Sequence, residues 1–191
     1  MIQRIRNLLN LSKAHGIARR YFFTNGYDGA LTMLGLNMGF YSTGNVSTNT
    51  AINACLGAAI ALFISGLTSA YISESEERKR ELIELERALV YELDGTEYDK
   101  AAKWVPVWIA LVNGFAPLLV SLFIIFPLWI DQLGMPLPLP PLESAMASAL
   151  LAVFLLSLFL GKVSGSFWLW TGLRGLLIAV VTCLIIFTLT K

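Results

Sequence analysis

The stretch that decides the fold is WVPVWIALVNGFAPLLVSLFIIFPLW, residues 104–129, which carries no charged side chain. A transmembrane helix needs about 20 mostly apolar residues to cross about 30 Å of hydrocarbon. This stretch is longer than that and contains Pro117, so we expect a kinked or tilted helix. Tryptophans stand near both of its ends, at Trp104, Trp108 and Trp129, where amphipathic rings favour the headgroup level of a bilayer.

Four further apolar runs are long enough to span a membrane. They lie at residues 22–41, 51–72, 145–161 and 167–189. The first is the least apolar, because it carries Asn25, Asp28 and Asn37. The sequence therefore predicts an all-α integral membrane protein with five transmembrane helices, in contact with membrane lipids.

The composition excludes most other classes of protein. The chain has 191 residues, of which 56% are hydrophobic and 14% charged, with a mean hydropathy of +0.67. Soluble domains are about 25% charged, so a soluble globular domain, a disordered chain and a disulfide scaffold are all excluded. A net charge of +1 offers no large basic surface, and we expect no nucleic-acid partner.

Basic residues occur in every second connection between the spans, and this pattern predicts the orientation of the protein in the membrane. The connections at 42–50 and 130–144 contain no Lys or Arg. The positive-inside rule then places the N-terminus, the connection at 73–103 and the one containing Lys162 in the cytoplasm. With five spans, the C-terminus lies outside. The basic residues that carry this argument are Arg4, Arg6, Lys13, Arg19, Arg20, Arg78, Lys79, Arg80, Arg87, Lys100, Lys103, Lys162 and Arg174.

The chain thus divides into residues 1–20, 21–72, 73–103 and 104–191. Residues 1–20 are predicted to form an amphipathic helix on the inner membrane surface. Residues 73–103 should continue the second span as a cytoplasmic helix that breaks near Asp94 and Gly95, followed by a short helix at 97–104. Four prolines make residues 135–141 a stiff, extended connection.

Asp28 is the leading candidate for function. An aspartate inside a membrane span costs about 2.5–3.5 kcal/mol, so such residues face a cavity or a partner. It shares one helix face with Asn25, Thr32, Gly35, Gly39 and Ser42. The functional reading is a cation ligand, and the alternative is a structural ion pair with Arg174.

Other potential metal ligands follow from their chemistry and spacing. Asn25 and the soft thioether of Met33 stand on the same helix as Asp28. Four glutamates spaced three, four and three residues apart share one face of the predicted cytoplasmic helix, where their oxygens could collect divalent cations. The alternative for these glutamates is a solvated helix face stabilised by ion pairs. They are Glu74, Glu77, Glu81 and Glu84.

No enzyme is expected. The sequence holds a single histidine, His15, and lacks a CxxC, an HExxH and a phosphate-binding loop. No resident cofactor is expected either.

Two stretches carry a resemblance to a known family. YFFTNGYDGALTMLGLNMG, residues 21–39, resembles the first span of the vacuolar iron transporter family, whose pattern is N-D-G-x-x-T-x-x-G. GKVSGSFWLWTGLRGLLIAVVT, residues 161–182, is similar to the last span of that family, with its G-L-R-x-L-L-I-x motif. The five-span count and the charged helix after the second span also agree.

The resemblance implies a homodimer that exports Fe²⁺ or a related divalent ion, such as Mn²⁺, from the cytoplasm in exchange for protons. Asp28 would be the membrane ligand, and the glutamates after Ile72 would stand in the cytoplasmic metal-collecting helices. The sequence departs from the family where a second-span glutamate is replaced by Ala70. It shows no organelle address, so the expected location is a prokaryotic plasma membrane. The alternative function is a non-transporting structural or assembly membrane protein in which Asp28 and Arg174 pair.

Overall fold

The computed structural model describes residues 14–44, 46–165 and 167–189. They form five helices and, within these ranges, no strand: α2 (Ala14–Thr43), α3 (Thr48–Leu89), α4 (Glu97–Gln132), α5 (Pro141–Val163) and α6 (Trp168–Leu189). The helices α3 to α6 are long and apolar enough to cross a membrane. The predicted all-helical membrane fold and four of its spans are thereby confirmed. The fifth predicted span, at 22–41, coincides with α2, which is not among those four.

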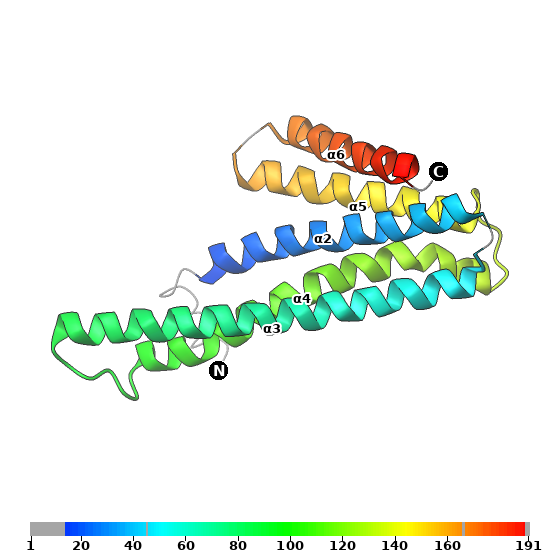
Figure 1. The fold of residues 1–191 in the computed structure, drawn as a ribbon. Coiled ribbons are helices and arrows are strands. Elements are labelled where there is room, and N and C mark those ends of the chain that lie inside the picture. The colour runs from blue at the N-terminus through cyan, green and yellow to red at the C-terminus, as the bar shows by residue number, and fades with distance from the viewer. Residues whose placement is uncertain (1–13, 45, 166, 190–191) are drawn as a thin grey trace.

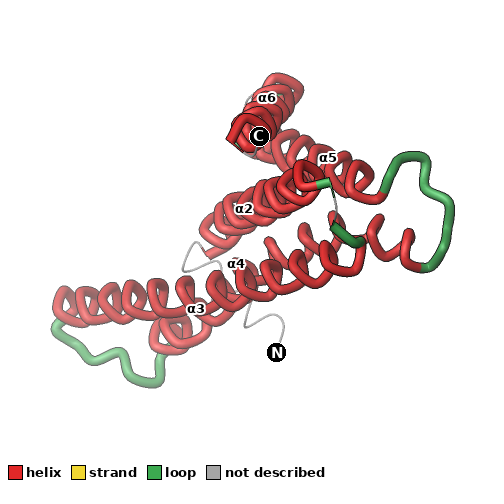
Figure 2. The backbone as a smooth tube through the Cα atoms, turned by 45° about the vertical axis from the view of Figure 1, so that its right-hand side comes forward, coloured by secondary structure: helices red, strands yellow, loops and turns green. Residues whose placement is uncertain are grey.

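The helix α2 lies between two antiparallel hairpins, α3–α4 on one side and α5–α6 on the other (Figure 1). At one end of the α3–α4 hairpin, the Thr48 hydroxyl donates to Asp131 at 3.0 Å and Gln132 donates to Asn49 at 3.1 Å. Toward the other end, the Tyr21 hydroxyl of α2 donates to Glu74 of α3 at 3.3 Å. Beyond that contact the α3–α4 hairpin projects past the other helices (Figure 2).

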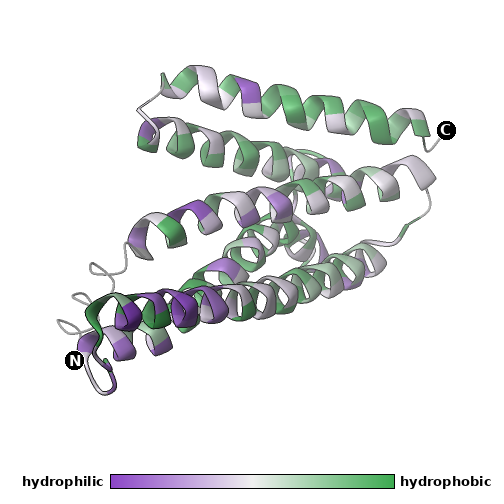
Figure 3. Cartoon of the chain, turned by 60° about the vertical axis from the view of Figure 1, so that its left-hand side comes forward, coloured by the Kyte–Doolittle hydropathy of each residue, from purple (hydrophilic) through white to green (hydrophobic). Residues whose placement is uncertain are grey.

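Charge is distributed unevenly along the bundle. Every Lys and Arg of the described residues lies toward the end at which α2 begins, α5 ends and the α3–α4 hairpin projects. Figure 3 shows hydrophilic residues concentrated on that projection, while α5 and α6 are mostly hydrophobic. The apolar window of α6 is only 17% buried by protein, as expected for a helix that faces lipid.

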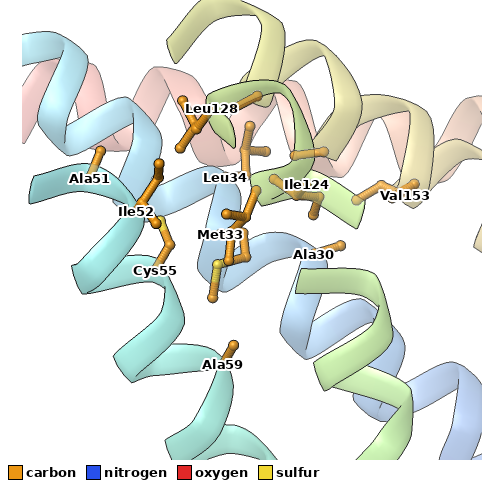
Figure 4. Close-up of a cluster of buried hydrophobic side chains, with 14 of the residues drawn as sticks. Ala30, Met33, Leu34, Ala51, Ile52, Cys55, Ala59, Ile124, Leu128 and Val153 are labelled. Atoms are coloured by element: carbon orange, nitrogen blue, oxygen red, sulfur yellow. The ribbon is translucent and has the colours of Figure 1, made fainter. Parts of the chain in front are cut away.

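The core forms where α2 meets its neighbours. Met33 and Leu34 of α2 are fully buried against Ile52 and Cys55 of α3 and against Ile124 of α4 (Figure 4). Because lipid tails are as apolar as these side chains, the contact is stabilised by close packing rather than by removal of apolar surface from water.

Glycines let the helices approach closely. A Cβ added to Gly29 of α2 would stand 2.8 Å from the Cα of Pro117 in α4, and one added to Gly114 of α4 would stand 2.9 Å from the carbonyl oxygen of Phe63 in α3. Only a residue without a side chain fits at such a crossing.

The projecting part of the α3–α4 hairpin differs in two details from its prediction. The helix α3 ends at Leu89, where Val90 adopts a left-handed conformation with φ 51° and donates its N–H to Glu86, so the predicted break near Asp94 and Gly95 was wrong by several residues. Gly95, with φ +72°, instead turns the chain into α4. Residues 97–104 are the first turns of α4 and not a separate helix.

Of two other predicted segments, the proline-rich connection is confirmed except for Pro141, which begins α5. The interfacial position of residues 1–20 stays a prediction. Residues 133–140 form no helix, as their prolines predicted. Of the predicted interfacial helix at 1–20, residues 14–20 begin α2, and residues 1–13 lie outside the described residues.

The start of α4 is capped by its own side chains. The Thr96 hydroxyl accepts a hydrogen bond from the Asp99 N–H, and the Asp99 carboxylate accepts from the Gly95 N–H. The carboxylate also accepts a hydrogen bond from the Lys103 ammonium group, which together with the Gly95 bond lowers the pKa of Asp99. A carboxyl group whose pKa is lower in the folded state stabilises the fold above its unfolded value and loses that contribution as the pH falls.

We therefore expect the turn at residues 90–96 to open more readily at pH 3 than at pH 6. Hydrogen exchange of its amides, corrected for the intrinsic pH dependence, measures this opening. In Asp99→Asn the increase in the exchange rate between pH 6 and pH 3 should be smaller. An equal increase in both proteins would contradict the role given to Asp99.

The Gly29 crossing gives a second prediction. Gly29→Ala should lower the free energy of unfolding by about 1–3 kcal/mol, because the added methyl group forces α2 away from Pro117. Thermal unfolding in detergent measures the change. Gly57→Ala in α3 is the control, since a Cβ there meets no atom within 4 Å. Equal melting temperatures for the two variants would refute the close contact.

Candidate functional site

Asp28 lies on the exposed side of α2 and lines a cavity of about 530 Å³ between the first turns of α2 and the end of α5. The hydroxyl-bearing residues Thr24, Tyr27 and Ser164 line the same cavity. Arg19 and Arg20 line it as well, eight to nine residues before Asp28, which corresponds to about 13 Å along a helix.

No ion pair joins Asp28 to a cation within the described ranges. The guanidinium of Arg174 instead lies over the ring of Trp170, 5.7 Å from its centroid. The two residues of the proposed structural pair are therefore not in contact. The carboxylate remains available to a ligand that enters the cavity.

Asn25 contributes to a polar chain across three helices. Its side-chain amide donates to the Oδ1 atom of Asn113 in α4, and Asn113 donates to the carbonyl oxygen of Gly66 in α3 at 2.6 Å. Asn113 is 3% exposed. Asn113 was not among the predicted site residues, although a polar residue inside the apolar stretch at 104–129 is a signal that could have identified it.

A second missed residue, Tyr27, connects α2 to the other hairpin. Its hydroxyl is hydrogen-bonded to that of Ser157 in α5, and Ser157 also donates to the carbonyl oxygen of Val153 at 2.7 Å. A Cβ on Gly175 of α6 would collide with the Ser157 hydroxyl, so α6 approaches at this point. One side of the Asp28 cavity is therefore held in place by contacts among α2, α5 and α6.

Met33 does not share the cavity with Asp28. It is fully buried in the core, as is Asn37 one turn further along α2. Asn37 donates to the Met33 carbonyl oxygen at 2.8 Å and lies 3.9 Å from the Cys55 sulfur, while its Oδ1 atom is buried without a hydrogen-bond partner. The thioether of Met33 is thus a packing group in this conformation.

The four glutamates are distributed over different environments. Glu74 is 7% exposed, with the Arg78 guanidinium 3.6 Å from its carboxylate and the Tyr21 hydroxyl as a hydrogen-bond donor. Glu81 pairs with Arg78 at 2.6 Å and Glu84 pairs with Arg80 at 3.0 Å. Glu77 faces solvent. Two arginines, Arg78 and Arg80, therefore pair with three of the four carboxylates.

Of the seven predicted ligands, only Asp28 lines the cavity between α2 and α5. Within residues 14–44, 46–165 and 167–189 of one chain, no three or more His, Cys, Asp and Glu side chains gather in an arrangement that could hold a metal ion.

The chain is similar to a curated protein of Methanocaldococcus jannaschii (strain ATCC 43067 / DSM 2661 / JAL-1 / JCM 10045 / NBRC 100440), named "Uncharacterized protein MJ0645". The two are 24% identical over 176 residues, which cover 90% of this chain and 88% of that protein. No protein-family model matches the chain, and no solved structure matches it. The arrangement of α2 among the apolar helices therefore carries the functional argument.

The polar chain through Asn113 generates a prediction. Asn113→Leu removes one hydrogen bond to Gly66 and one to Asn25, and hydrogen bonds between membrane helices are worth about 0.6 kcal/mol on average and about 1.7 kcal/mol at most. We expect a loss of about 1–2 kcal/mol in the free energy of unfolding. Unfolding in mixed micelles at increasing denaturant measures it.

Asn53→Leu is the matched control, because Asn53 lies on the exposed side of α3. Its stability should match that of the wild-type protein. A loss in the control as large as that in Asn113→Leu would show that the polar chain contributes nothing specific.

Proposed function

We propose that this protein exports divalent cations, Fe²⁺ or Mn²⁺, from the cytoplasm as a homodimer, in exchange for protons. One observation carries the proposal. Asp28 places a carboxylate without a cationic partner on a helix that runs among the apolar helices, beside a cavity lined by hydroxyl groups. An acidic residue in such a position marks an ion pathway by default.

The proposal requires that α2 is a fifth span. Its 30 residues correspond to about 45 Å of helix, which is enough to cross a bilayer, and α2 runs alongside the four apolar helices (Figure 1). The polar side chains Asn25, Tyr27 and Asn37 all donate to or share hydrogen bonds with protein groups. This supports α2 in an apolar environment, where unpaired polar groups are costly.

The orientation in the proposal follows from charge. The end of the bundle that holds the described Lys and Arg residues is placed in the cytoplasm by the positive-inside rule. The C-terminal end of α6 then lies outside. We place the protein in a prokaryotic plasma membrane.

A second copy would complete the ion site. Asp28 faces away from the core, and Gly39, three turns further along α2, has open space where a side chain would stand. A second copy packed against this face would bring two Asp28 carboxylates together. Two carboxylates would bind a divalent cation better than one. The second carboxylate would replace the glutamate that the vacuolar iron transporter family, which the sequence resembles, has at the position of Ala70.

In the proposed cycle, the solvent-facing Glu77 raises the cation concentration near the projecting hairpin. A partly dehydrated ion reaches Asp28, where the hydroxyl group of the lining residue Thr24 offers a further oxygen ligand. Protonation of Asp28 from the outer side weakens binding and releases the ion. The proton then leaves to the cytoplasm and restores the carboxylate.

The test is metal flux into liposomes that contain the purified protein. Asp28→Asn keeps the size of the side chain and removes its charge, so flux of Fe²⁺ and Mn²⁺ should fall to the level of empty liposomes. Glu143→Gln, at the start of α5 on the opposite end of the bundle, should transport at the wild-type rate. Wild-type flux in Asp28→Asn would refute the assignment.

Calorimetry separates transport from a purely structural role. Saturable heat with Fe²⁺ or Mn²⁺ that disappears in Asp28→Asn supports the proposal. A structural or assembly protein predicts no saturable heat in either protein.

A further inference from the structure

A second cavity adjoins the one that contains Asp28. Its volume is about 440 Å³, and residues of α2, α4 and α5 line it. Its lining is entirely apolar: Phe22, Phe23, Leu119, Val120, Phe123, Ala152, Leu155, Leu156 and Phe159. Phe23 lines both cavities, so the apolar groove and the polar cavity are neighbours along α2.

The polar cavity beside the apolar groove has basic residues in its lining. Arg19 and Arg20 are exposed, line the Asp28 cavity and have no carboxylate partner within the described ranges. The guanidinium of Arg20 contacts the Tyr21 ring, 5.9 Å from its centroid. Lys162 stands on the last turn of α5, beside the lining residue Val163.

We infer that the groove and the polar cavity together bind an anionic phospholipid from the leaflet at the basic end of the bundle. The phosphate lies at Arg19 and Arg20, since the planar guanidinium matches phosphate geometry with paired hydrogen bonds. One acyl chain occupies the groove between α4 and α5. Basic pockets between membrane helices on the cytoplasmic side recognise lipid headgroups in this way.

The charge arrangement supports an anionic headgroup over a neutral one. Two unpaired guanidinium groups stand at adjacent positions of one helix, while the nearest acidic lining residue, Asp28, lies about two turns deeper along α2. A phosphodiester would supply the missing negative charge at the arginines. A zwitterionic headgroup would add a positive charge next to them.

A bound phosphate also bears on the proposed transport. A divalent cation that approaches Asp28 through this cavity must pass two positive charges, and like charges repel most strongly where the dielectric constant is low. The lipid phosphate neutralises them. The inference on lipid binding does not depend on transport, and its test measures binding alone.

The test is native mass spectrometry of the full chain in detergent, titrated with phosphatidylglycerol or phosphatidylcholine that carry the same acyl chains. The wild-type protein should bind phosphatidylglycerol at least about fivefold more tightly. Arg19→Gln with Arg20→Gln should abolish this preference. Lys79→Gln with Arg80→Gln, which removes the same charge from the exposed side of α3, should retain it.

Two further measurements test the apolar half of the site. Leu155→Trp fills the groove and should weaken the binding of both lipids about equally. Leu151→Trp lies on the exposed side of the same helix but outside the groove, and it should weaken the binding of neither lipid. Glycerol phosphate, the headgroup without acyl chains, should bind at least about tenfold more weakly than the lipid.

Three results would overturn the inference. The first is equal binding of the two lipids by the wild-type protein, and the second is an unchanged preference in the Arg19 and Arg20 variant. The third is binding of glycerol phosphate as tight as that of the lipid, which would indicate a site for free phosphate. Circular dichroism and gel filtration establish that each variant is folded before binding is compared.

Discussion

The structure depends on one constraint: the polar side chains of α2 must find protein partners, because hydrocarbon offers none. Asn25 meets Asn113 of α4, Tyr27 meets Ser157 of α5, and Asn37 donates to the backbone of its own helix. These partners lie on both sides of α2. A position between the two hairpins gives Asn25 and Tyr27 their partners together, and it leaves Asp28 as the acidic group of α2 that protein does not neutralise.

Close packing makes that position possible. Apolar side chains gain little from leaving lipid for protein, so stability between membrane helices comes from dispersion and from hydrogen bonds at short range. Gly29, Gly114 and Gly175 each stand where a neighbouring helix would collide with a side chain. The close contact of Gly29 with Pro117 lies one turn along α2 from the hydrogen bond between Asn25 and Asn113. Small residues and polar contacts therefore act at the same crossing.

Most of the fold could be predicted from the sequence, because apolar runs and their flanking charges are local signals. The four apolar helices and the extension of α3 lie where the sequence placed them. The candidate site was harder to predict from the sequence. Hydrophobic periodicity cannot reveal that Asn25 meets Asn113, 88 positions away, or that Met33 points into the core rather than toward Asp28. The glutamate spacing predicted a shared helix face, and three of the four side chains form ion pairs with Arg78 and Arg80, as the alternative interpretation proposed.

The helix α3 runs without interruption from Thr48 to Leu89, a length of about 63 Å. Such a rod acts as a lever. The outer arm, the part of α3 that follows Glu74, projects past the other helices (Figure 2). The hydrogen bond between Tyr21 and Glu74 joins α3 to α2 where this part begins. Because the rod is stiff, a force applied to the outer arm tilts the inner arm too. The inner arm contains Gly66, whose carbonyl oxygen ends the amide chain from Asn25. Mechanical load on the projecting part of the α3–α4 hairpin would therefore be felt one turn from Asp28.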